Sequence, residues 1–208
     1  MINESYYWKK ELYGCFLIIS KFRLLRKPSK QSYVNLEKAI LMGAYIVRKL
    51  NDANKIPPYF FKNQEAIECY VSNGTSVDFL NWNKIHNHYI HNQKIRNTWK
   101  WHDIINQIIH SFSLIFSYDS SDKLDSILIN SDKTKTEGLY IIPIRTLLNI
   151  YLSISEGDLK AIEYIRDPKS GEMKMKDGTY SYPNKLNINT AVNETLNGNV
   201  YIRPKVLI

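Results

Sequence analysis

The stretch TWKWHDIINQIIHSF, residues 98–112, carries the strongest periodic signal in the chain. Apolar residues recur in it at helical spacing and continue past its end: Trp101, Ile104, Ile105, Ile108, Ile109, Phe112, Ile115 and Phe116. This spacing places all of them on one side of an α-helix. The pattern predicts a helix from about residue 98 to residue 116 that lies at the centre of the core.

The opposite side of the same segment is polar. His102, Asn106 and His110 follow one another at intervals of four residues. His110 stands at the edge of the apolar stripe, so we interpret it as a core histidine that hydrogen-bonds Asn106 or a backbone carbonyl. A general base is the alternative role for such an imidazole.

Two further helices are predicted before this segment. One runs from about Glu4 to Lys27 and ends at Pro28, because proline has no N–H group and disfavours helical backbone before it. The other runs from about Lys30 to Ala53, with Ser29 as its N-cap. Its apolar stripe consists of Leu36, Ile40, Gly43, Val47 and Leu50.

Hairpin patterns surround the central segment. Residues 68–80 (ECYVSNGTSVDFL) hold an Asn-Gly pair between β-forming residues, and residues 124–144 and 163–175 each hold two strand-like runs around a polar turn. Between the last two, Pro143 fits the first turn of a helix over IRTLLNIYLSIS. The order of elements predicts an α+β fold, in which an N-terminal helical hairpin packs with a central amphipathic helix and antiparallel β-hairpins.

We expect one globular domain over residues 1–175, with residues 1–57 as its helical part. From about Lys176 the chain is polar and without a sustained period, so residues 176–208 are predicted to form a loose tail. The tail would end in a short strand, VYIRPKVLI, that pairs with a sheet edge or with another molecule.

Composition points to a cytoplasmic protein with an anionic partner. The net charge of the 208 residues is +8, which favours nucleic acid, an acidic protein or a membrane surface as a partner. The first residues carry charges where a signal peptide needs an apolar run, and no apolar run is long enough to span a bilayer. We therefore expect no membrane association.

Cys15 and Cys69 form no paired motif and fit buried thiols in a reducing compartment.

The positive charge is concentrated in KFRLLRKPSK, which begins at Lys21. This segment holds five cations and no acid: Lys21, Arg23, Arg26, Lys27 and Lys30. Cations at the C-terminal end of a helix offset its macrodipole, which is one explanation for them. The alternative is a patch that contacts the phosphates of a nucleic acid, and we predict such a patch here.

The five histidines fall within 25 residues, and three of them form the pattern His86-x-His88-x-x-His91. Zinc needs three or four converging ligands, and neither a cysteine nor a carboxylate lies inside this cluster. We interpret it as a polar connector and expect neither a metal site nor a cofactor. The sequence also has no P-loop, dinucleotide fingerprint, HExxH or G-x-S-x-G motif, which disfavours nucleotide hydrolysis, zinc protease and serine hydrolase chemistry.

Arg96 and Asn97, followed by four residues and His102, resemble the R-x(4–6)-H motif of HEPN-type ribonucleases. The resemblance covers seven residues. It implies a helical, usually dimeric protein of bacterial toxin or phage-defence systems. In that family the arginine and histidine act on the RNA 2′-hydroxyl and the scissile phosphate, and Arg96 and His102 would take these roles. A base and a fixed cation suffice for this reaction, so no metal is required.

Three functions follow as hypotheses. The first is a nucleic-acid-associated binding or accessory protein with a basic N-terminal surface. The second is a metal-independent endoribonuclease that uses Arg96 and His102 and acts as a homodimer. The third is a protein–protein interaction module whose basic patch faces an acidic partner.

Overall fold

The computed structural model describes residues 2–183 and 186–203. The helices within these ranges are α1 (Ser5–Phe22), α2 (Lys30–Asp52), α3 (Trp101–Ile109), α4 (Ile144–Glu156) and α5 (Ile188–Leu196). The strands are β1 (Gln64–Ser72), β2 (Tyr89–Lys100), β3 (Ser111–Tyr118), β4 (Leu124–Ser131), β5 (Gly138–Pro143), β6 (Asp158–Arg166) and β7 (Met173–Ser181). Two short 3-10 turns cover Pro58–Lys62 and Ile85–Asn87. The predicted α+β class is confirmed.

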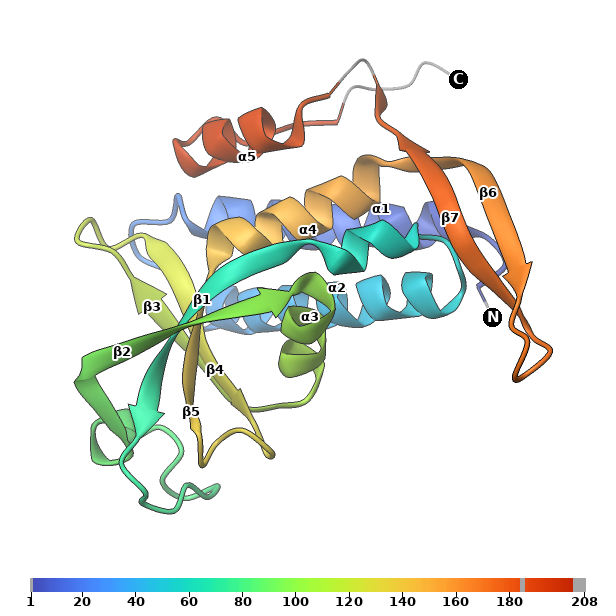
Figure 1. The fold of residues 1–208 in the computed structure, drawn as a ribbon. Coiled ribbons are helices and arrows are strands. Elements are labelled where there is room, and N and C mark those ends of the chain that lie inside the picture. Colours follow the sequence, from blue (N-terminus) through green and yellow to red (C-terminus); the bar gives the residue numbers. More distant parts are fainter. Residues whose placement is uncertain (1, 184–185, 204–208) are drawn as a thin grey trace.

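The first two helices form the expected antiparallel pair. Glu4 caps α1 by accepting a hydrogen bond from the backbone N–H of Tyr6, and Ser29 caps α2 in the same way for Ser32. The pair packs against α4, which is almost entirely buried and which also contacts α5 and the sheet (Figure 1).

Gly43 is the position that allows α2 to approach α4 closely. A Cβ atom there would lie 2.2 Å from the ring of the fully buried Tyr151. The Tyr151 hydroxyl donates a hydrogen bond of 2.6 Å to the carbonyl of Ile40, one turn earlier. A glycine is therefore required by packing at this point of the stripe.

The larger sheet is antiparallel throughout and has the order β2-β1-β5-β4-β3. One face of this sheet packs against the helices, and the side chains of Ile67, Ile129 and Ile142 on that face are fully buried. The other two strands, β6 and β7, form a separate two-stranded arm that projects beside the helices (Figure 1).

The central helix is shorter than predicted. It ends at Ile109, and Phe112, Ile115 and Phe116 belong to strand β3. These three residues also fit a helical spacing, whereas β3 is fixed by its hairpin pairing with β4, which the spacing within one segment does not show. Both faces of β3 are covered by apolar side chains, so its sequence lacks the clean alternation of a half-exposed strand.

The interpretation of His110 as a buried core histidine is wrong. His110 is the exposed C-cap of α3, and its backbone N–H donates to the carbonyl of Asn106. It borders a polar hollow together with Arg48, Lys133 and Thr134. Because α3 ends at Ile109, His110 does not continue the buried face of the helix.

The Asn-Gly pair of residues 73 and 74 does not close a tight hairpin. Strands β1 and β2 are paired, but residues 73–88 connect them as an ordered loop in which Gly74 has a φ of +87°. The two later hairpins, β4–β5 and β6–β7, are as predicted.

The segment after Lys176 is more ordered than predicted. Strand β7 continues to Ser181, and Ala191 and Val192 of α5 are buried in the main core. Arg203 then pairs with the buried Glu156 at 2.6 Å. Residues 200–203 are not in a strand, and the remainder of the predicted terminal strand lies outside the described residues.

Within the described ranges, none of the helices combines the length and the apolar character that crossing a membrane requires.

Candidate nucleic-acid interface

The face of the large sheet that points away from the helices is divided into a covered half and an open half. The loop of residues 73–88 covers one half, where Val77 packs with Tyr89, Leu128 and Leu139 in a second, smaller core. Burial raises the pKa of Tyr89 to about 12, so its hydroxyl stays protonated. That hydroxyl accepts a hydrogen bond of 2.6 Å from Asn130 and donates to the carbonyl of Lys135.

His88 holds the covering loop in place. Its side chain is only 4% exposed, and its two ring nitrogens lie 2.8 Å from the hydroxyl of Thr75 and 3.2 Å from the carbonyl of Asn81. Both nitrogens are thus occupied within the loop. Among the described residues, no three His, Cys, Asp or Glu side chains converge as metal ligands.

The open half forms a groove of about 340 Å³ that crosses the sheet from β2 to β3. It is lined by Ala66, Glu68, Tyr70, Lys94, Arg96, Ser117, Asp125, Ser126, Leu128, Ile141 and Pro143. The register of β1 and β2 places Arg96 opposite Glu68 and Lys94 opposite Tyr70. Two cations, one carboxylate and one aromatic ring therefore lie on the same face of the sheet.

Lys94 is held by its neighbours across the strand pair. Its ammonium nitrogen lies 2.9 Å from Glu68 Oε2 and 5.3 Å from the centre of the Tyr70 ring. The hydrogen bond to Glu68 raises the pKa of Lys94. The charge on Lys94 is therefore secured at neutral pH.

Arg96 is exposed and makes no hydrogen bond or ion pair with any side chain in the described part of the chain. Its guanidinium keeps all of its donors available for a ligand, and a guanidinium suits the two-point geometry of a phosphate.

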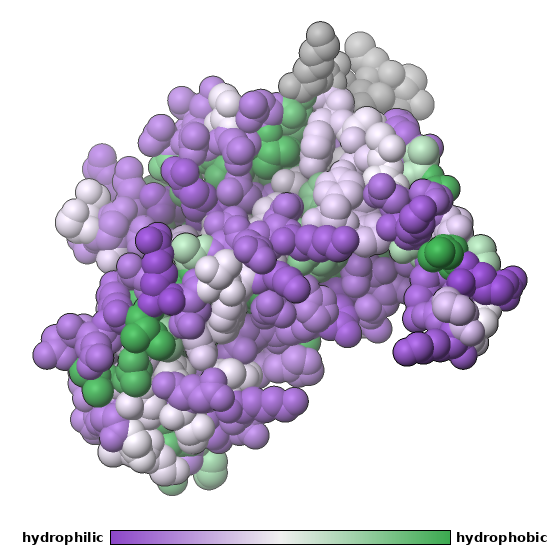
Figure 2. Space-filling view, viewed as in Figure 1, coloured by the Kyte–Doolittle hydropathy of each residue, from purple (hydrophilic) through white to green (hydrophobic). Residues whose placement is uncertain are grey.

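Aromatic rings continue the surface from Tyr70 toward the loop. The ring of His91 lies 5.1 Å from that of Tyr70, and the ring of His86 lies 4.6 Å from that of His91. A row of flat rings beside two cations can stack bases and contact the phosphates between them. Figure 2 shows that the side of the molecule seen in Figure 1 is mainly hydrophilic, with scattered hydrophobic spots.

The predicted basic patch is four cations rather than five. Lys21, Arg26, Lys27 and Lys30 are exposed, but the side chain of Arg23 is only 10% exposed. Arg23 donates to the carbonyl of Leu124 and lies 4.0 Å from Asp119, so it ties the α1–α2 turn to the β3–β4 hairpin. The α1–α2 turn, which carries the four exposed cations, is thus held beside the hairpin whose Ser117 and Asp125 line the groove.

Arg96 and His102 lie in different surroundings within one chain. Arg96 lines the groove on β2, whereas His102 stands in the first turn of α3, with its ring 6.1 Å from that of Phe61. Asn106 links His102 to a different arginine: its amide nitrogen lies 3.1 Å from His102 Nδ1, and its oxygen accepts a hydrogen bond of 2.5 Å from Arg48. No local sequence signal marks this link, because Arg48 and Asn106 are 58 positions apart in the chain.

The two thiols offer no nucleophile. Cys15 and Cys69 are both buried, and burial raises the pKa of each thiol to about 11. The thiolate is the reactive form, and it is scarce near neutral pH at such a pKa.

No protein-family model, curated protein or solved structure matches this chain.

Proposed function

We propose that the protein binds single-stranded nucleic acid in the sheet groove, as a binding or accessory protein rather than through chemistry of its own. The observation that carries the proposal is Arg96, which has no partner among the described residues and lines the groove together with Tyr70 and Lys94. Its guanidinium on an open antiparallel sheet supplies phosphate binding, and the rings of the groove supply stacking.

A single strand suits this surface better than a duplex. The two cations lie beside a row of rings, so bases must be unpaired to reach the rings of Tyr70, His91 and His86. Glu68 and Asp125 also line the groove and would repel a continuous line of phosphates.

The exposed cations of the α1–α2 turn extend the binding surface. Lys21, Arg26, Lys27 and Lys30 would contact phosphates of a strand that leaves the groove past the β3–β4 hairpin. Such contacts carry no sequence information and depend strongly on salt.

The test is fluorescence anisotropy with labelled RNA and DNA strands of about 12 nucleotides, a typical site size, and with a duplex of the same length. We expect the double variant Lys94→Gln, Arg96→Gln to lower affinity about tenfold or more and to flatten the salt dependence, because each lost phosphate contact reduces the slope. Lys169→Gln is the matched control, since Lys169 is an exposed cation in the turn of the β6–β7 arm. Failure of the wild-type protein to bind at low salt, or an equal effect of the control, would overturn the proposal.

Metal-independent RNA cleavage is the second candidate, favoured by the partly exposed His102 and its link through Asn106 to Arg48. The binding samples also test it. Labelled RNA that stays intact with wild-type protein in EDTA would exclude cleavage, whereas cleavage lost in His102→Ala would replace the binding proposal with an enzymatic one.

A further inference from the structure

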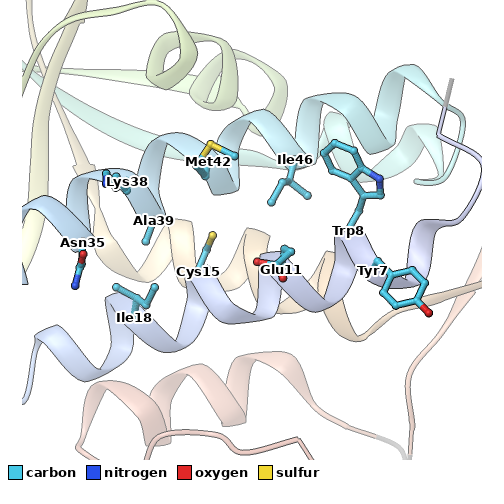
Figure 3. A pocket seen from close by; sticks show the side chains of 10 residues that line it. All are labelled: Tyr7, Trp8, Glu11, Cys15, Ile18, Asn35, Lys38, Ala39, Met42 and Ile46. Atoms are coloured by element: carbon cyan, nitrogen blue, oxygen red, sulfur yellow. The ribbon is translucent and has the colours of Figure 1, made fainter.

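The outer surface of the α1–α2 pair holds an apolar groove of about 410 Å³ (Figure 3). Residues of both helices line it: Tyr7, Trp8, Glu11, Cys15 and Ile18 of α1, and Asn35, Lys38, Ala39, Met42 and Ile46 of α2. Trp8 also lines a neighbouring hollow with Tyr45 and Lys49, so the depression continues toward the C-terminal end of α2.

The walls of this groove expose large apolar side chains. The exposed fractions of Tyr7, Ile18 and Met42 are 65%, 42% and 51%. The inward stripes of both helices are already used, because Leu12, Phe16 and Ile40 are fully buried against the rest of the fold. The groove is therefore a second apolar face of the same helices, and covering it would remove these side chains from water.

Two charges of opposite sign stand on opposite walls of the groove. Glu11 lies on α1 and Lys38 on α2, both are exposed, and neither forms an ion pair with another residue in the described ranges. The arm behaves differently: Lys174 pairs with Asp167, and Lys176 pairs with Glu163. An unpaired acid and an unpaired base on one surface are complementary to a second copy of that surface. In a two-fold pairing, a contact of Glu11 with Lys38 of the other copy occurs twice.

We propose that this groove is the contact surface of a homodimer, in which the α1–α2 pairs of two copies face each other. The exposed apolar walls supply the driving force, and the two Glu11–Lys38 pairs set the orientation. The proposal is independent of nucleic-acid binding, because the sheet groove and the α1–α2 groove share no lining residue.

The test measures the molar mass of the full chain by analytical ultracentrifugation over a range of protein concentrations. We expect the wild-type protein to be a dimer and Met42→Glu to be a monomer. Met173→Glu is the matched control, since Met173 on the arm is also 51% exposed, and it should leave the dimer intact. Circular dichroism checks that each variant is folded.

Charge exchange keeps the test decisive if Met42→Glu fails to fold. Glu11→Lys and Lys38→Glu should each raise the dissociation constant about tenfold, because like charges then face each other. The double variant Glu11→Lys, Lys38→Glu should restore the wild-type value.

Three outcomes would overturn the homodimer: a wild-type protein that is monomeric at all concentrations, single charge variants without effect, or a dimer abolished by Met173→Glu and kept by Met42→Glu. A monomer that still binds RNA would reject the dimer alone. A dimer that does not bind RNA would reject the proposed function alone.

Discussion

Consecutive residues of strand β1 lie in two different environments. Ile67 and Cys69 are buried against the helices, whereas Glu68 and Tyr70 line the open groove on the other face of the sheet. The two environments arise because successive side chains of a strand point to opposite faces of the sheet. Stability and ligand binding should therefore be separable residue by residue along this strand.

The largest expected effect is on the buried face. Ile67→Ala should lower the free energy of unfolding by about 2–5 kcal/mol, because it leaves a cavity between the sheet and the helices. Glu68→Ala, one residue further on the same strand, should change it by less than about 0.5 kcal/mol. Urea denaturation of both variants measures the difference. Similar losses of unfolding free energy in the two variants would mean that Glu68 is packed against other residues and that its face of the sheet is not open.

The covered half of the open face should give an intermediate effect. His88→Ala removes the two side-chain hydrogen bonds from His88 to Thr75 and Asn81 in the loop of residues 73–88, and leaving their partners unsatisfied costs about 1–3 kcal/mol. His86→Ala is the control: His86 is exposed, so stability should stay within about 0.5 kcal/mol. Equal unfolding free energies for the two variants, again from urea denaturation, would contradict the structural role of His88.

Much of the fold follows from local sequence signals. The α1–α2 pair, α4 and the two later hairpins are marked by apolar periodicity, by proline and by turn residues that act within a few positions. Strand β3 is not evident from the sequence because the spacing of Phe112, Ile115 and Phe116 fits a helix, and only pairing with β4 decides between the two. Helix α5 is not evident because its buried face is small, with Ala191, Val192 and Thr195 as its buried residues.

The candidate site was less accessible to prediction. The spacing from His102 marks Arg96 in the sequence, but the surroundings of Arg96 depend on the register of β1 and β2, which joins residues 26 positions apart in the pair Glu68–Lys94. The burial of Arg23 likewise depends on the distant β3–β4 hairpin. Residue type identified the cations, whereas long-range contacts decide which of them remain available to a ligand.

The smallest effect on stability should come with a gain in binding. Glu68→Gln removes the carboxylate that pairs with Lys94 on the open face, and a pair this exposed contributes only about 0–1 kcal/mol. The same change frees Lys94 and removes a negative charge opposite Arg96, so affinity for a single strand should rise at low salt and the gain should shrink as salt is added. Anisotropy titrations at two salt concentrations measure both. Weaker binding by Glu68→Gln would instead assign the carboxylate a direct contact with a base. The open face would then select its ligand through Glu68, and Lys94 would serve to hold that carboxylate in place.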